Sequence, residues 1–259
     1  MTTKLVSTAR LGLLTWLLTA CATLPASGAD SWKEEVLLHD GQKIIVERSQ
    51  IYKGRREPGQ EVPAGEHTIR FALPGSNRQL SWTSEYGQDL GRTNFNALAL
   101  HVKQGVPYLV VEPNLCLSYN KWGRPNPPYV VFKLEANEWQ RIAITDLPQE
   151  FKTINLIVND SRQNDIRVNS QSSGYVPFDA VQKINSSLPQ PQYKTILREK
   201  MPEATMRTNC SERVSNGNGT WLGLDWFTSE KTLASCQKVC DMKSFAPQYC
   251  PCANIFEGK

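Results

Sequence analysis

Cysteines are the residues whose type and number point most directly to chemistry in this chain. There are seven of them, and one, Cys21, stands apart near the N-terminus. The other six form an even set, which is typical of disulfide-bonded proteins outside the cytoplasm. We therefore expect three disulfides among Cys116, Cys210, Cys236, Cys240, Cys250 and Cys252.

The C-x3-C spacing of Cys236 and Cys240 restricts how these cysteines can pair. A helix is predicted to follow Ser229 as its N-cap, which places the two thiols one turn apart on the same face. Thiols in that arrangement rarely bridge each other. Each should therefore have a different partner, and we expect Cys250 and Cys252 to supply at least one.

A thiolate site for zinc or copper is the alternative use of the same four C-terminal cysteines. The C-x-C spacing of Cys250 and Cys252 is a poor chelate for a closed zinc site, so disulfides are favoured. We predict no metal ligand and expect no cofactor. The C-x-x-C spacing of thiol oxidoreductases does not occur in the sequence.

The histidines are the second group of residues with chemical potential: His39, His67 and His101. A hydrolase needs a base beside a nucleophile, and a hairpin that brought His101 beside Ser81 or Asp89 would supply that pair. The sequence has no G-x-S-x-G and no H-E-x-x-H motif. Strand alternation places His101 on a polar face with Lys103. We therefore expect a solvated or hydrogen-bonded histidine there and predict no catalytic residue.

The segment 119–128 gathers aromatic residues, cations and prolines, and it is the candidate binding loop. Tyr119, Trp122 and Arg124 are of the types that carry binding energy at interfaces. The alternative is that Tyr119 and Trp122 pack over an open end of the core. A second aromatic group, Trp221 with Trp226 and Phe227, is predicted to fill the core of the C-terminal unit.

The residues before Cys21 have the arrangement of an export signal, with cations first and an apolar stretch after them. Lys4 and Arg10 precede the apolar stretch LGLLTWLLTA at 11–20, which is too short to span a bilayer permanently. The end of this stretch, Leu-Thr-Ala-Cys, resembles the lipobox of bacterial lipoproteins. The resemblance implies cleavage after residue 20 and a diacylglycerol on Cys21, with palmitate-type acylation of the new N-terminus. The alternative is an ordinary secreted protein cut at small residues.

This resemblance also implies a location. Residues 21–30 are small and weakly polar, as expected of a tether between lipid and domain. Ala22 after the cysteine favours sorting to the outer membrane, where the body would face the periplasm. The expected partners are the membrane, through the lipid anchor, and an envelope protein or glycan. The formal charge of +4 falls to +2 without Lys4 and Arg10. This small excess of positive charge does not indicate a nucleic-acid-binding protein.

The folded body is predicted to be mainly β. Residues 31–158 form a meander of antiparallel hairpins that turn near 40–41, 74–77, 104–105 and 135–138, followed by one more strand at 154–158. A sandwich, a barrel-like and a propeller-like arrangement all remain open. Residues 159–205 are predicted to be a polar connection with short helices at 179–187 and 193–200. Residues 206–259 are predicted to form a small helical unit stapled by disulfides.

Three stretches resemble a set of proteobacterial lipoproteins of unassigned activity. They are SWKEEVLLHDGQKIIVERS at 31–49, CLSYNKWGRPNPPYVVFK at 116–133 and EWQRI at 138–142, so the likeness covers residues 31–158. It implies no known chemistry. The function we expect is that of a non-catalytic envelope lipoprotein, a structural or interaction module. The alternatives are a lipoprotein that binds a glycan or peptidoglycan fragment, and an envelope hydrolase using His101 or His67.

Overall fold

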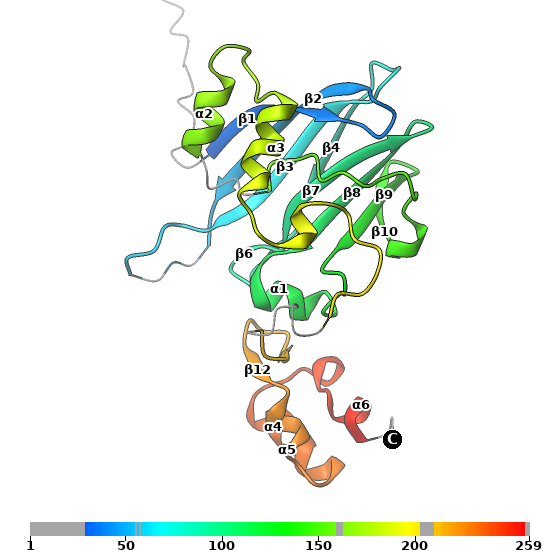
Figure 1. Cartoon of the computed structure of the whole chain (residues 1–259). Helices are drawn as coiled ribbons and strands as arrows, with labels where there is room; N and C mark the ends of the chain where they lie inside the picture. Colours follow the sequence, from blue (N-terminus) through cyan, green and yellow to red (C-terminus); the bar gives the residue numbers. More distant parts are fainter. Residues whose placement is uncertain (1–28, 55, 57, 159–162, 203–209, 257–259) are drawn as a thin grey trace, which may run out of the picture.

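The computed structural model describes residues 29–54, 56, 58–158, 163–202 and 210–256 (Figure 1). The predicted signal segment, Cys21 and the tether up to residue 28 lie outside this range. The described part is mainly antiparallel sheet with small helices toward the C-terminus, as predicted. The first strand begins at Ala29, which is two residues before the predicted start of the β domain.

The first sheet is a four-stranded meander in which every strand pairs with its neighbour in sequence, in the order β1-β2-β3-β4. Its strands are β1 (Ala29–Leu37), β2 (Lys43–Tyr52), β3 (Ala64–Ala72) and β4 (Gln79–Thr83). Side chains alternate along them, so Ile69 and Phe71 are buried while Arg70 and Ala72 are exposed. The predicted turns at 40–41 and 74–77 therefore gave the correct pairing.

The second sheet is also a four-stranded meander, with the order β10-β9-β8-β7. Its strands are β7 (Phe95–Lys103), β8 (Val106–Pro113), β9 (Val130–Glu135) and β10 (Glu138–Ile142). A short hairpin, β5 (Tyr86–Gly87) and β6 (Arg92–Thr93), connects the last strand of the first sheet to the first strand of the second. The helix α1 (Leu115–Lys121) connects β8 to β9 within the second sheet.

The inner faces of the two sheets share one hydrophobic core, which makes the domain a sandwich. Trp82 of the first sheet contacts Phe95 and Phe132 of the second, with ring centroids 6.4 and 6.1 Å apart. Side chains bridge both open edges: Trp139 donates to the Ser81 carbonyl, and Asn155 donates to the Leu37 carbonyl. Within the described residues, no strand pairing closes the sheets into a barrel.

The expected alternation of β7 is wrong at Leu98, because the strand carries a β-bulge between Ala97 and Ala99. The extra residue turns Leu98 to the outer face of the sheet, away from the Leu100 side chain. That outer face is not solvated. His101, which was expected to be solvated or hydrogen-bonded there, is 1% exposed because the segment around Phe151 covers it, and its ring is hydrogen-bonded to the Thr153 carbonyl.

Two predictions for the connecting segments are also wrong. The segment 154–158 is not a regular strand, although Leu156 N–H donates to the Leu98 carbonyl of β7. The predicted helix at 193–200 is reduced to a 3-10 turn at Pro191–Tyr193, because Ile196 leaves the turn to pack against the second sheet. The polar connection contains α2 (Gln163–Ser170), and α3 (Phe178–Ser186) follows where a helix was expected.

The C-terminal unit projects from the end of the sandwich where α1 lies (Figure 1). It consists of β11 (Arg213–Ser215), β12 (Trp221–Gly223), α4 (Asp225–Thr228), α5 (Leu233–Met242) and α6 (Cys252–Phe256). The N-cap of α5 is Thr232 rather than Ser229, because Thr232 and Ser235 form a reciprocal capping box.

Disulfides hold this unit together around a small core. Cys236 is bonded to Cys252 and Cys240 to Cys250, so the two helix cysteines have different partners. Phe227 is fully buried between them, in contact with Phe245 at a centroid distance of 5.2 Å. These covalent links compensate for a core that is too small to be stable by itself.

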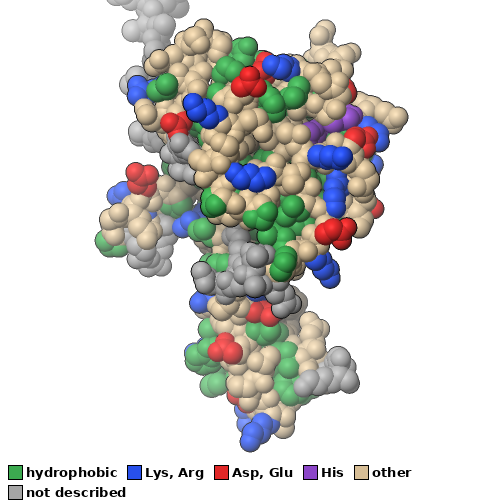
Figure 2. Space-filling view, in the orientation of Figure 1, with side chains coloured by type: hydrophobic (Ala, Val, Ile, Leu, Met, Phe, Trp, Pro, Cys, Tyr) green, Lys and Arg blue, Asp and Glu red, His purple; other side chains and the backbone are tan. Residues whose placement is uncertain are grey.

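The surface of the molecule carries charges of both signs. In the face shown in Figure 2, Lys and Arg side chains lie among Asp and Glu side chains on the sandwich and on the C-terminal unit alike. None of the helices in the described part of the chain has the length and apolar character needed to cross a membrane.

Candidate binding cleft

The C-terminal unit is attached to the sandwich by a disulfide beside α1. Cys116 of α1 is bonded to Cys210, with the Cα atoms 5.1 Å apart. The Arg124 guanidinium donates to the Cys210 carbonyl at 3.0 Å, which holds the same point from a second side. A covalent bond and a charge-assisted hydrogen bond therefore fix where the unit begins.

Asn120 connects the two parts through its side-chain amide. Its Nδ2 donates to the Ser211 carbonyl at 3.1 Å and to the Cys116 carbonyl at 2.9 Å. Its Oδ1 accepts from the backbone N–H of Arg213 at 3.0 Å. One amide thus satisfies backbone groups on both sides of the junction, which orients β11 against α1.

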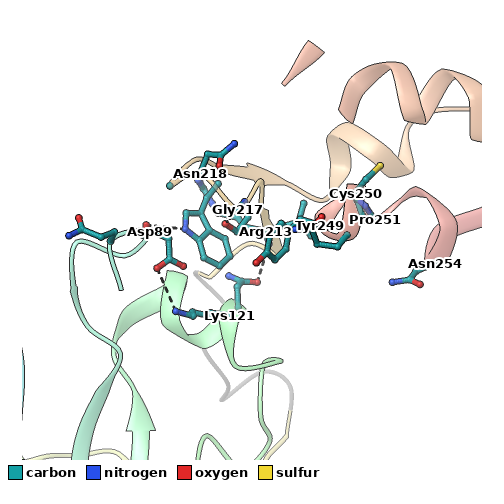
Figure 3. A pocket seen from close by; sticks show the side chains of 16 residues that line it. Asp89, Lys121, Arg213, Gly217, Asn218, Tyr249, Cys250, Pro251 and Asn254 are labelled. Carbon is teal, nitrogen blue, oxygen red and sulfur yellow. Dashed lines mark hydrogen bonds and ion pairs between the residues drawn. The ribbon is translucent and has the colours of Figure 1, made fainter. Parts of the chain in front are cut away.

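A cleft with a volume of about 890 Å³ lies in the angle between the sandwich and the C-terminal unit. One wall comes from the 86–92 hairpin and α1, and the other comes from the β11–β12 loop and the segment after Pro247 (Figure 3). The lining residues are Gln88, Asp89, Asn120, Lys121, Arg213, Val214, Ser215, Gly217, Asn218, Gly219, Trp221, Gln248, Tyr249, Cys250, Pro251 and Asn254.

The two aromatic side chains of this cleft are held in fixed positions. The indole N–H of Trp221 donates to the Asp89 carbonyl at 3.1 Å, across the cleft from one wall to the other. Tyr249 is 49% exposed, and its ring packs against Gly217, where an added Cβ would be 2.4 Å from the ring. Gly217 also has a φ of +83°, so glycine is required there for both reasons.

Charges in the cleft are partly compensated. Lys121 lies 3.5 Å from the Asp89 carboxylate and 3.4 Å from the Glu85 carboxylate. The side chain of Arg213 is exposed, and its Nε donates to the Ser211 hydroxyl at 3.3 Å. Among the residues that the structure describes, no acceptor binds the two terminal nitrogens of this guanidinium.

The residues of the predicted binding loop are placed elsewhere. Tyr119 belongs to α1 and is 3% exposed, and the Arg124 guanidinium lies 5.0 Å from its ring centroid. Trp122 packs on the sandwich core, 4.6 Å from Phe95 and 6.4 Å from Phe132 between ring centroids. These contacts match the packing alternative, and none of the three residues lines the cleft.

The cleft residues that sequence reasoning missed come from the turn-rich stretch 215–220 and its surroundings. Trp221 was assigned to the core of the C-terminal unit, but it lies in the cleft, and Trp226 is 49% exposed. Phe227 is the one member of that group that fills the core. The alternation of glycine and asparagine before Trp221 was the available signal, because it predicts a loop that exposes backbone and amides.

The histidines lie away from the cleft. His101 stacks on Phe151 at a centroid distance of 4.7 Å, and its Nε2 donates to the Thr153 carbonyl at 3.0 Å. Burial lowers the pKa of His101 to about 4, although the Thr153 carbonyl favours the charged form. His67 is 2% exposed on the inner face of the first sheet. Neither histidine lines the cleft, and neither Ser81 nor Asp89 is a hydrogen-bond partner of the His101 ring.

The cysteines of the C-terminal unit also bear on the metal alternative. The sulfur atoms of Cys240, Cys250 and Cys252 all lie within 4.8 Å of one another. The structure nevertheless pairs each of them in a disulfide, and a disulfide sulfur has no thiolate to offer a metal.

Comparison of this chain with protein-family models, with curated proteins and with solved structures gives no match.

Proposed function

We propose that this protein is a non-catalytic, lipid-anchored module of the cell envelope that binds N-acetylated glycan in the cleft between its two parts. The observation that carries the proposal is the pair of fixed aromatic rings, Trp221 and Tyr249, in a polar cleft of about 890 Å³. The proposal combines two expectations from the sequence: the protein is an interaction module, and the ligand of that module is a glycan.

The chemistry of the cleft suits sugars. A tyrosine or tryptophan ring offers a flat apolar face to the C–H groups of a sugar ring, while its polar edge remains hydrogen-bonded. Four side-chain amides that do not hold the junction line the same cleft, those of Gln88, Asn218, Gln248 and Asn254. Each amide presents both a donor and an acceptor, which matches the hydroxyl and acetamido groups of an N-acetylated glycan. Peptidoglycan fragments are the envelope glycans of this type.

The proposed anchor is compatible with an accessible cleft. The start of β1 lies beside α2, with which Asp30 and Trp32 share a hollow. In Figure 1, α2 is at the opposite end of the molecule from the C-terminal unit. A lipid on Cys21 would therefore attach the protein by the end remote from the cleft, and the cleft would point away from the membrane.

The hydrolase alternative receives less support from this arrangement. Its candidate bases, His101 and His67, are both buried away from the cleft. His101 is also kept neutral by burial, which lowers its pKa to about 4. A glycan held between Trp221 and Tyr249 would therefore have neither histidine within reach.

Isothermal titration calorimetry of the soluble body with peptidoglycan disaccharides and glycan strands tests the proposal. The variant Tyr249→Ala removes one sugar platform at an exposed position, so we expect binding to weaken about tenfold or more while the fold is kept. The matched control is Met242→Ala, an exposed side chain of the same unit that does not line the cleft. Absence of binding by the wild-type protein would refute the proposal, as would equal binding by both variants.

Anchoring is tested separately in cells. Replacing Cys21 by Ser should abolish incorporation of labelled fatty acid and leave the signal segment uncleaved, because the modified thiol is required for both steps, so the electrophoretic mobility of the protein should change. A Cys21→Ser protein that stays in the membrane pellet with unchanged electrophoretic mobility would show that the anchor is not at Cys21.

A further inference from the structure

A second hollow adjoins the cleft on the other side of β12. It has a volume of about 670 Å³ and is lined by residues that include Glu212, Leu222, Asp225 and Trp226. Arg213 and Trp221 line both hollows. The two hollows therefore adjoin at these two side chains, and we refer to them together as the groove of the C-terminal unit.

Trp226 is presented to this second hollow by a rigid helix turn. Its neighbour Phe227 is fully buried in the disulfide-linked core, which fixes α4, while Trp226 itself is 49% exposed. The ammonium group of Lys243 lies 4.6 Å from the centroid of the indole and supports one of its faces. An exposed tryptophan held in this way offers its other face to a ligand.

Arg213, at the junction between the two hollows, has hydrogen-bond donors that a ligand could use. The exposed guanidinium of Arg213 is anchored through Nε to the Ser211 hydroxyl, and the described residues provide no acceptor for its terminal nitrogens. The planar donor fork of arginine binds oxygen atoms in pairs. Gly223 leaves room for the Asp225 carboxylate, because an added Cβ would lie 2.1 Å from it.

We infer that the groove binds a linear oligosaccharide that runs from the Tyr249 side of the cleft, past Arg213, onto Trp226. This inference rests on the proposed function and specifies its ligand as a chain rather than a single sugar or a disaccharide. The platforms at Tyr249 and Trp226 are the two ends of the binding site. Arg213 donates to the hydroxyl, acetamido or carboxylate oxygens of the sugar between them.

The inference predicts that affinity depends on chain length. Calorimetric titration of the full soluble body with β-1,4-linked N-acetylglucosamine oligomers, from two to six sugars, should show affinity rising about tenfold or more between the shortest and the longest. Trp226→Ala should remove this gain and leave the affinity for the disaccharide unchanged. Arg213→Gln should also weaken binding of the long oligomers, whereas Met242→Ala should have no effect.

The outcomes separate this inference from the proposed function. If the disaccharide and the hexasaccharide bind equally well, and Trp226→Ala binds both like the wild type, the extended groove is refuted while the cleft is retained. If the wild-type protein binds neither these oligomers nor peptidoglycan glycan strands, both proposals fail. A native circular dichroism spectrum of each variant establishes that lost binding does not reflect lost folding.

Discussion

The indole nitrogen of Trp221 lies 3.1 Å from the backbone carbonyl oxygen of Asp89, to which it donates a hydrogen bond, although the two residues are 132 positions apart in the sequence. Asp89 belongs to the hairpin that follows the first sheet, and Trp221 belongs to the disulfide-linked C-terminal unit. With Asn120 and the Cys116–Cys210 disulfide, this contact sets the angle between the two parts. The shape of the cleft therefore depends on these three connections, of which the indole hydrogen bond is the one made across the cleft.

This relationship leads to the first prediction. Trp221→Phe keeps an aromatic ring but removes the donor, so the free energy of unfolding should fall by about 1 kcal/mol, the net value of such a bond. Hydrogen exchange should become faster in the 86–92 hairpin and in β12. Trp226→Phe is the control, because Trp226 is half-exposed and lies outside this contact. Unchanged exchange in Trp221→Phe would show that the contact does not hold the unit.

The meander could be predicted from the sequence because hairpin signals are local. Residues Asp40-Gly41 and Gln104-Gly105 mark turns, and apolar residues alternate on either side of them. These signals state which strands pair, and the structure confirms the antiparallel meander. They do not indicate how two meanders pack against each other. The sandwich arrangement is determined by core contacts between distant strands, such as that of Trp82 with Phe132.

The errors have a common physical cause, which is the contribution of distant segments. His101 is buried because Phe151, fifty residues later in the chain, covers its face of the sheet. The helix expected at 193–200 is absent because Ile196 packs on the second sheet, which outweighs local helix propensity. Trp221 lies in the cleft rather than in a core because its indole reaches Asp89. Single-sequence patterns contain none of these contacts.

The second prediction separates packing from recognition at the loop after α1. Trp122→Ala should lower the free energy of unfolding by about 3 kcal/mol, because the ring packs against Phe95 and Phe132 in the sandwich core. Arg124→Ala should cost about 1 kcal/mol through loss of its hydrogen bonds to Asn120 and Cys210. Urea unfolding measures both values. A loss below about 0.5 kcal/mol for Trp122→Ala would indicate a surface residue instead.

The third prediction concerns the disulfide that joins the two parts. Cys116 and Cys210 are separated by 94 positions, so the bond closes a long loop that includes β9 and β10. Replacing both cysteines by serine should lower stability by about 4.7 kcal/mol in the chain-entropy model. It should also weaken glycan binding, because one wall of the cleft is no longer held in place.

The matched control for this variant is the Cys240–Cys250 pair, which closes a loop of only 10 positions inside the C-terminal unit. Its removal should cost less, about 3 kcal/mol by the same model, and should loosen only that unit in hydrogen exchange. If the Cys116/Cys210 variant left both the sandwich and glycan binding unchanged, the proposed role of this bond in shaping the cleft would be wrong.

The fourth prediction is a loss of stability at mildly acidic pH that originates at His101. Burial lowers the pKa of His101 to about 4 in the folded protein, against an ordinary value of 6.5 in the unfolded chain. Above pH 6.5 both states are neutral, and the contribution of His101 to stability is fully present. As the pH falls from 6.5 toward 4, the unfolded chain binds a proton that the folded protein does not. Stability should therefore decrease by about 2 kcal/mol between about pH 7 and pH 5.

Two measurements assign this loss to His101. The first is urea unfolding of the wild type and of His101→Gln at both pH values. The variant should show a pH dependence smaller by about 2 kcal/mol, whatever its absolute stability. The second is a titration of the His101 ring resonances by NMR, which should show no protonation of the folded protein down to about pH 5 because Phe151 and the Thr153 carbonyl enclose the ring. A ring that titrates near its ordinary pKa in the folded state would contradict the burial of His101 beneath this segment.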